Sequence, residues 1–269
     1  MASYSIEGIV LRHADYREND RMLTLLTPRG RVDALSRGCK RPKSPLLPCS
    51  EVFTLGNYEL LGSKNHCVIT SCLLTDSFYP LRLDIDKLSC AAYMANVCEA
   101  TVQPEEDARR PFLLLARALG CLSYQSVAPR KVLSVFLLHY AVAMGYRPRL
   151  NHCVQCGERL PEEDSVLFDI EQGGVVCSRC AGQSRRAAML SPAERAWLAE
   201  ALAQGVRGEL PPEDAPLPLL QAYLESRLEK RIPPLLTPLQ FFKRQEENNH
   251  ENLKRCTLYR RKRPRGRSV

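Results

Sequence analysis

The sequence predicts an α+β protein of several domains: a β-barrel, an α-helical domain and a metal module inserted into it. Three observations predict this class. Short β-rich runs between turn signals fill the first 78 residues, a helical spacing of apolar residues begins beyond Leu83, and two CxxC pairs interrupt the helical part. With 269 residues, the chain is long enough for two or three modules with their own cores.

The first domain is expected to contain five strands, because runs of four to ten β-forming residues recur between turns. One turn is Thr27–Gly30, another occupies residues 62–65, and a polar, proline-containing loop occupies residues 38–48. Five strands in so short a segment are too few for a sandwich, so they favour a small barrel such as an OB-fold over residues 1–80. The expected strands are 4–12, 21–27, 31–37, 51–61 and 66–74.

The helices of the second domain follow from apolar spacing and from their end signals. Leu88, Ala91 and Ala95 share one face of a first helix, and two further segments, 112–122 and 132–144, are so apolar that we expect both to be buried. Pro129 fits the start of the third helix and Gly145 its end.

Further helices are expected beyond the metal module. Ser191 and Glu194 form a capping box for a helix that ends near Ala203. Another helix ends before Pro233, and a last one is expected over 239–247. The helical domain is therefore assigned to residues 81–150 and 186–250, with the metal module at 151–185. Four leucines mark the face of the helix that precedes Pro233: Leu217, Leu220, Leu224 and Leu228.

Two CxxC pairs separated by twenty residues predict a structural zinc site. Two paired thiolates on tight knuckles give the four sulfur ligands in tetrahedral array that zinc prefers, and glycines near both pairs suit the sharp turns of the backbone. A redox CxxC motif is the alternative, although it needs no second pair. His152, beside the first cysteine, is either a neighbour of the site or a substitute ligand. The expected ligands of the one structural zinc ion are Cys153, Cys156, Cys177 and Cys180.

Composition predicts a cytoplasmic protein with reduced thiols. The N-terminus has no basic flank followed by an apolar core, and no apolar run approaches the roughly twenty residues that cross a bilayer, so no membrane association is expected. The other eight cysteines are expected to act as small packing residues.

The net charge of +8 is concentrated at the C-terminus, where the last thirty residues carry ten Lys/Arg against three Asp/Glu. We expect residues 251–269 to form a disordered basic tail, either an auxiliary DNA arm or a solubilising end.

A second group of cations lies in the expected barrel and predicts contact with a nucleic-acid backbone. Phe53 and Tyr58, on a neighbouring strand, are the candidates for base stacking, although a core position is the more ordinary role for Phe53. The alternative for the cations is a solvated hairpin, in which they contact only water. Six of them fall within fifteen residues opposed only by Asp33, and Lys64 is added from the following turn: Arg29, Arg31, Arg37, Lys40, Arg41, Lys43 and Lys64.

The chain has no motif of an enzyme. It lacks a P-loop, GxSxG, HExxH or a spaced pair of carboxylates, and the acidic run at 105–107 is expected to be a loop or a helix start. His139, within an apolar helix, is expected to be a hydrogen-bonded core residue. Two other functions stay open. One is a zinc-stabilised protein-interaction scaffold with incidental DNA contact, and the other is a metal-dependent nuclease, which would need an open metal position.

Several segments in this order resemble the RecO family of bacterial DNA repair and recombination mediators: GIVLR at 8–12, ENDRMLTLLT at 18–27, GCKRPKS at 38–44, CVQCG at 153–157 and GGVVC at 173–177. The resemblance implies an OB-fold that binds single- and double-stranded DNA, with Arg37, Lys40, Arg41 and Lys43 as the first choice for backbone contacts. It also implies strand annealing and, with RecR, loading of the RecA recombinase onto strands coated by single-stranded-DNA-binding protein. The RecA filament would then be an indirect partner, and the protein would associate with the nucleoid. The stretch 231–243 departs from the family pattern because it is rich in proline.

Overall fold

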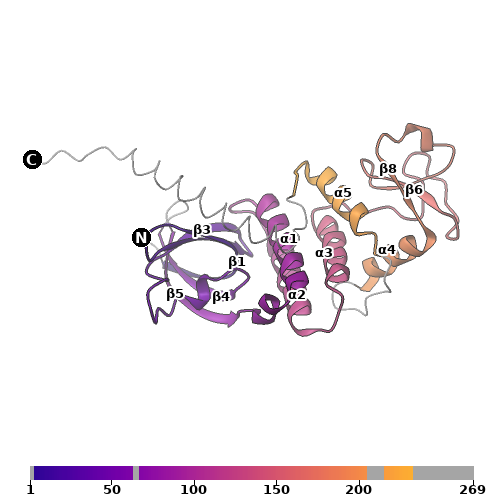
Figure 1. Ribbon diagram of the computed structural model, residues 1–269. Coiled ribbons are helices and arrows are strands. Elements are labelled where there is room, and N and C mark those ends of the chain that lie inside the picture. The colour runs from indigo at the N-terminus through magenta and orange to yellow at the C-terminus, as the bar shows by residue number, and fades with distance from the viewer. Residues whose placement is uncertain (1–2, 63–66, 205–214, 233–269) are drawn as a thin grey trace, which may run out of the picture. The chain divides into compact units, whose positions relative to one another are not determined.

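A computed structural model describes residues 3–62, 67–204 and 215–232 of the chain, which divides into two compact units. Of the described residues, 3–62, 67–78 and 102–109 form unit 1, and 79–101, 110–204 and 215–232 form unit 2. Unit 1 contains a five-stranded sheet, and unit 2 contains helices and a small three-stranded sheet. Figure 1 shows the helices α1 to α5 and the labelled strands of the two sheets, coloured along the chain. The α+β class is confirmed.

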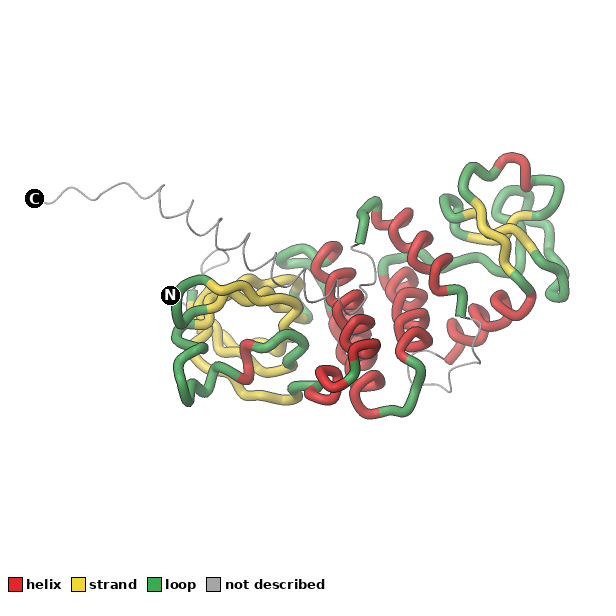
Figure 2. Tube along the Cα trace, viewed as in Figure 1, coloured by secondary structure: helices red, strands yellow, loops and turns green. Residues whose placement is uncertain are grey.

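The strands of unit 1 hydrogen-bond in the order β1-β2-β3-β5-β4, and β4 returns to β1, so every strand has two partners (Figure 2). All of these pairs are antiparallel except β3 with β5, where Ala34 lies opposite Cys67. The strands are β1 (Ser3–Asp15), β2 (Arg21–Thr27), β3 (Gly30–Ser36), β4 (Leu55–Leu61) and β5 (Cys67–Asp76).

Alternate side chains of these strands point inward and form the core of unit 1, as the period of two in a strand requires. Tyr58 and Leu25 are fully buried there, and Ile6, Val10 and Ile69 pack beside them. The hydroxyl of Tyr58 donates to the carbonyl oxygen of Cys49 at 2.9 Å, which satisfies the polar end of a buried ring.

β4 begins four residues later than the sequence predicts. A short 3-10 helix occupies Pro48–Ser50, the amide of Thr54 donates to the carbonyl of Glu51 at 3.2 Å, and Phe53 has a φ of 71°. The amide of Phe53 still donates to the carbonyl of Val10 at 2.7 Å, and the amide of Val10 donates to that of Thr54 at 3.0 Å. Because a left-handed residue interrupts extended backbone, the regular ladder with β1 starts only at Leu55.

The segment Val102–Arg109 belongs to unit 1 although it lies between two helices of unit 2 in the sequence. The amide of Arg31 donates to the carbonyl of Gln103 at 3.1 Å, and the amide of Ala108 donates to that of Pro28 at 3.1 Å. Gly30 makes this approach possible, because a Cβ at that position would lie 2.5 Å from the carbonyl oxygen of Gln103, and its φ of 98° is also one that glycine tolerates.

In the part of unit 2 that the structure describes, α3 packs against α1, α4 and α5 (Figure 1). The α3 residues from Val132 to Leu138 are all buried, as the sequence predicts, but α2 is only half buried, with Leu113 50% exposed. The imidazole Nε2 of His139 lies 2.8 Å from the carbonyl oxygen of Ala201, which confirms the expected hydrogen bond, and the side chain is partly buried. The helices are α1 (Ile85–Thr101), α2 (Arg109–Tyr124), α3 (Pro129–Ala143), α4 (Pro192–Gln204) and α5 (Leu217–Leu228).

The capping box at the start of α4 is confirmed. The amide of Ser191 donates to Oε2 of Glu194 at 2.9 Å, and the amide of Glu194 donates to Oγ of Ser191 at 3.3 Å. The two side chains therefore satisfy free amides at the helix start, and α4 begins at Pro192.

The structure has a three-stranded sheet between α3 and α4 that the sequence analysis does not predict. It has the order β7-β6-β8, with β6 (Val166–Asp169), β7 (Gly174–Val176) and β8 (Ala187–Leu190). β8 pairs with β6 beyond residue 185, the expected end of the metal module.

Lys64, the helix expected over 239–247 and the basic tail 251–269 lie outside the described residues. Among the helices in the described ranges, none combines the length and the apolar character that crossing a membrane requires.

Candidate metal centre and nucleic-acid interface

The four cysteines of the two CxxC pairs lie together, with all four sulfur atoms within 4.8 Å of one another. The sulfurs of Cys156 and Cys177 are 3.7 Å apart, too far for a disulfide. Four sulfurs bound at about 2.3 Å in a tetrahedron are about 3.8 Å apart, so this distance fits an edge of such a site. The donor set and its spacing therefore fit one zinc ion.

A backbone hydrogen bond closes each of the two cysteine knuckles. In the first knuckle, the amide of Gly157 donates to the carbonyl of Cys153 at 2.9 Å, and Gly157 has a φ of 76°. In the second, the amide of Cys180 donates to the carbonyl of Cys177 at 3.0 Å. Gly173, by contrast, belongs to the turn between β6 and β7, where its amide donates to the carbonyl of Asp169 at 2.8 Å.

The electrostatics of the cluster favour negative charge on one sulfur. Burial opposes ionisation of the Cys153 thiol, but hydrogen bonds, chiefly from backbone amides, outweigh it and lower the pKa to about 6. The hydrogen bond with Cys177, followed by burial, raises the pKa of Cys180 to about 12. Thiolates this close repel one another, and a divalent cation among them removes that conflict.

Arg195 ties the cysteine segment to α4. Its guanidinium is buried, with 3% exposed, and it donates to the carbonyl oxygens of Leu150 at 2.8 Å and Leu160 at 3.1 Å, and also to that of Pro161. These carbonyls flank the first knuckle on both sides, so α4 fixes the stretch that carries Cys153.

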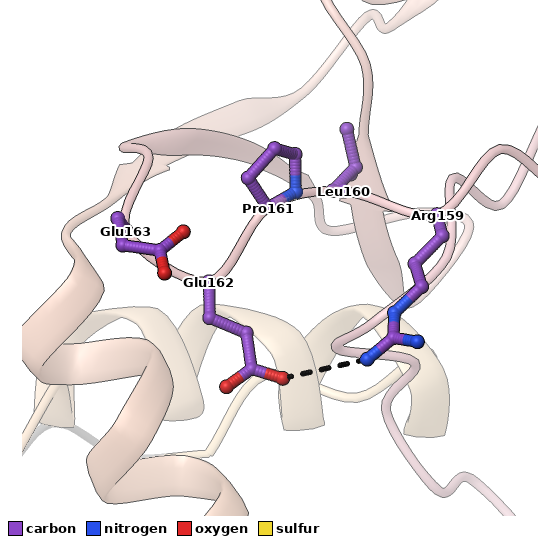
Figure 3. Close-up of a pocket in the computed structure, with 5 residues that line it drawn as sticks. All are labelled: Arg159, Leu160, Pro161, Glu162 and Glu163. Atoms are coloured by element: carbon purple, nitrogen blue, oxygen red, sulfur yellow. Dashed lines mark ion pairs between the residues drawn. The ribbon is translucent and has the colours of Figure 1, made fainter.

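His152 is exposed and is not part of the metal-binding group, which consists of the four cysteines among the described residues. A shallow pocket of about 370 Å³ lies nearby and is lined by residues 159–163 (Figure 3). Arg159 and Glu162 face each other there, with Nη2 and Oε1 3.9 Å apart, and both side chains are about three-quarters exposed. The ionisable side chains that line the pocket are all exposed, so the pocket does not indicate a catalytic site.

The structure divides the predicted cations of the first domain into two groups at opposite ends of β3. Arg29 and Arg31 lie at its start, beside the segment 102–109, and the others follow its end. At ~3.3 Å per residue, Arg31 and Arg37 are about 20 Å apart along the strand. The backbone therefore does not bring all six cations together in one groove.

The four cations after β3, Arg37, Lys40, Arg41 and Lys43, belong to a loop that we call the basic loop, residues 37–43. The loop is built from turns, since the amide of Arg41 donates to the carbonyl of Gly38, and that of Ser44 to the carbonyl of Arg41, each at 3.1 Å. The side chains of Arg37, Arg41 and Lys43 are exposed. The ammonium of Lys40 instead contacts Oδ2 of Asp15 at 2.9 Å, so this cation is already paired.

The connection between β1 and β2, residues 16–20, is bonded to the basic loop. The amide of Gly38 donates to Oδ1 of Asp20 at 2.8 Å, and the amide of Lys40 donates to the carbonyl of Asn19 at 3.1 Å. Sequence reasoning missed these roles of Asn19 and Asp20. The available signal was Asp20 in a short polar connection, because an Asp side chain there can bind a backbone amide. Asn19 acts through its backbone carbonyl, for which its side chain gives no signal.

An ion-pair network continues from Asp15 beneath the two loops. Arg21 lies 3.6 Å from Asp15, and its Nη1 donates to Oε1 of Glu51 at 2.7 Å. Burial and the nearby charge of Arg21 lower the pKa of His13, so its imidazole is neutral at pH 7. Asp15 and Glu51 therefore pair with Lys40 and Arg21, whose side chains are partly buried, and not with the exposed cations of the basic loop.

The two aromatic residues considered for stacking lie in the core. Phe53 is 3% exposed and Tyr58 is fully buried, with burial as the main cause of a raised pKa of its hydroxyl. Neither ring offers a face to a base, so the stacking hypothesis for them is wrong. Alternation with Asn57 and Glu59 along β4 points Tyr58 inward, whereas Phe53 lies in the turn before that strand. Sequence pattern alone does not tell the two faces of the strand apart.

Comparison with known proteins identifies the family. A family model described as Recombination protein O N terminal matches residues 1–78, and one described as Recombination protein O C terminal matches residues 82–235. Relatives named DNA repair protein RecO include one from Roseiflexus sp. (strain RS-1), 34% identical over 84% of this chain and 82% of the relative. Another, from Anaeromyxobacter sp. (strain Fw109-5), is 32% identical over 84% of this chain and 92% of the relative. A third, from Acetivibrio thermocellus, is 29% identical over 68% of this chain and 73% of the relative. The chain belongs to the RecO family.

Proposed function

We propose that this protein is a non-enzymatic recombination mediator in DNA repair, which binds single- and double-stranded DNA and promotes annealing of complementary strands. With RecR, it would load RecA onto strands coated by single-stranded-DNA-binding protein. The names of the relatives support a role in DNA repair. The observation that carries DNA binding is the basic loop, where three exposed cations project from a backbone fixed by turns and by Asp20.

The five-stranded sheet, in this proposal, is an OB-fold barrel. Two features support this assignment. One is the strand order β1-β2-β3-β5-β4 with a parallel β3–β5 pair, and the other is the short 3-10 helix Pro48–Ser50 between β3 and β4. Small barrels of this kind bind oligonucleotides across strands 2 and 3 and with the loops beside them. The basic loop leaves the end of β3 and so borders that face.

Zinc, in this proposal, is a folding cofactor held by Cys153, Cys156, Cys177 and Cys180. A four-thiolate site leaves no open position for a water molecule or substrate, so the ion would brace the module and supply no catalysis. The sheet β7-β6-β8 is small, and cross-linking by metal would replace the core that such a module cannot bury.

The dependence of DNA binding on salt tests this function. Replacement of both Arg41 and Lys43 by alanine should weaken binding to a single-stranded oligonucleotide and reduce the slope of log K against log salt by about 1.4 in magnitude, about 0.7 for each phosphate that is no longer neutralised. Fluorescence anisotropy titrations at salt concentrations from about 50 to about 300 mM measure the slope.

Arg185→Ala is the matched control, because Arg185 is an exposed arginine in unit 2. Its slope should equal that of the wild type. Equal slopes for all three proteins would contradict a role for the basic loop. An absence of binding by the wild type in dilute buffer would contradict DNA binding altogether and favour an interaction scaffold.

A further inference from the structure

The loop between β1 and β2 presents an aromatic ring and a guanidinium in contact at the surface. The Cζ atom of Arg17 lies 5.4 Å from the centroid of the Tyr16 ring, which is the geometry of a cation–π pair. The side chain of Arg17 is exposed and that of Tyr16 is partly exposed. The amide of Tyr16 donates to the carbonyl of Asp20 at 3.0 Å, which closes the loop into a compact turn.

Three contacts fix this turn against the basic loop. Asp20 accepts from the amide of Gly38, Asn19 accepts from the amide of Lys40, and Asp15 binds the ammonium of Lys40. Asp15 lies directly before Tyr16 in the chain, so the backbone that carries the ring is anchored to the basic loop.

This arrangement joins the two kinds of contact that a single strand of nucleic acid requires. Exposed cations neutralise phosphates, and flat aromatic or guanidinium faces stack on unpaired bases. The loop between strands 1 and 2 is also one of the two loops with which barrels of the OB type contact oligonucleotides. Phe53 and Tyr58 lie in the core, whereas Tyr16 belongs to the 16–20 connection, which is hydrogen-bonded to the basic loop.

We propose that Tyr16 and Arg17 form a stacking site for unpaired nucleobases next to the basic loop. The inference rests on the proposed function and adds to it, because phosphate contacts alone do not distinguish an exposed base from a paired one. In a duplex, the base faces are covered by their neighbours. The pair therefore gives the protein a preference for single strands that the cations cannot give.

Tyr16→Leu tests the stacking site with three ligands of equal length: a thymine homopolymer, an abasic strand with the same number of phosphates, and a duplex. The variant should bind the homopolymer about 5- to 150-fold more weakly, because one stacked base contributes on the order of 1 to 3 kcal/mol. Binding to the abasic strand and the duplex should stay at the wild-type level, and the salt slope should not change. Tyr16→Phe, which keeps the ring, should bind all three ligands like the wild type.

A crosslinking measurement on the wild-type protein keeps the test independent of how the variant folds. Irradiation with a 5-iodouracil oligonucleotide should attach the base to Tyr16, and mass spectrometry should find the adduct on the tryptic peptide of residues 13–17. Adducts elsewhere with none on that peptide would overturn the proposal. Equally weakened binding of Tyr16→Leu to the thymine and abasic strands, or no weakening at all, would also overturn it.

The two proposals fail separately. Replacement of Arg41 and Lys43 could change the salt slope while Tyr16→Leu binds the homopolymer like the wild type. The stacking proposal would then be wrong, and the proposal that the basic loop binds DNA would stand. If the wild type binds no oligonucleotide, both are wrong.

Discussion

The guanidinium of Arg195 is buried, and it donates hydrogen bonds to three backbone carbonyl oxygens. A buried charge is tolerated only when its donors are used, and here the backbone on both sides of the first cysteine knuckle uses them. Sequence reasoning assigned Arg195 no role, because it sits in a helix whose other signals, the Ser191–Glu194 capping box and an apolar face, explain the helix without it. Its acceptors are 34 to 45 positions away in the chain, and no local pattern reports so distant a contact.

Arg195→Ala should lower the free energy of unfolding of unit 2 by roughly 3 to 5 kcal/mol, because it removes charge-assisted hydrogen bonds and leaves buried carbonyls unsatisfied. Urea denaturation followed by circular dichroism measures the change. Arg117→Ala, which truncates an exposed arginine of α2, should change the same quantity by less than about 0.5 kcal/mol. A decrease no larger than that of the control would show that the carbonyl contacts contribute little.

At the scale of elements, sequence patterns predicted the existence and type of the long segments well. β2 has the predicted bounds, and α3 begins at Pro129 as predicted. The patterns failed where an element is short or where a turn overrides it. β7 has three residues, too few to show alternation, and β4 is delayed by the left-handed Phe53. The CxxC pairs predicted the cysteine cluster because ligand spacing is itself a local pattern, whereas the bonding of the 16–20 connection to the basic loop is not.

Removal of one sulfur should unfold the cysteine module and leave the five-stranded sheet of unit 1 intact. Cys177→Ala is expected to lose the one zinc ion per chain that elemental analysis should find in the wild type, because three thiolates hold the ion less tightly than four. Hydrogen exchange should then accelerate over residues 151–190 but not over β1 to β3.

Cys121→Ala is the control for this prediction, since Cys121 is a buried cysteine of α2 outside the cluster. It should keep its zinc and the slow exchange of the module. Wild-type zinc content and exchange in the Cys177 variant would contradict a structural metal.

For the whole molecule, the distribution of charge matters more than the net value of +8. Residues 1–80 carry ten Lys/Arg against eight Asp/Glu, which is nearly neutral. The fold nevertheless creates a local positive field there, because Asp15 and Glu51 face Lys40 and Arg21 while Arg37, Arg41 and Lys43 reach solvent. Counting charges along the sequence locates the cations but not their partners, so it does not show that Lys40 is paired with Asp15.

Deletion of residues 259–269, which carry six Lys/Arg, should weaken DNA binding with little change in folding. The salt slope should fall in magnitude by up to about 4 if every deleted cation binds a phosphate of a single strand. Anisotropy titrations and thermal melts measure the two effects.

A variant of full length with glutamine at the same six positions should bind like the deletion, because charge and not length is responsible. Unchanged affinity in both variants would assign the C-terminal residues a role in solubility only.

The docking of residues 102–109 beside Gly30 has a consequence for how the protein is made. When the ribosome has released the first 78 residues, all five strands exist, but the stretch that covers the turn between the second and third is still unsynthesised. Unit 1 is complete only after α1 and residues 102–109 have been synthesised. A truncated chain that ends after β5 therefore lacks the segment that packs beside Gly30.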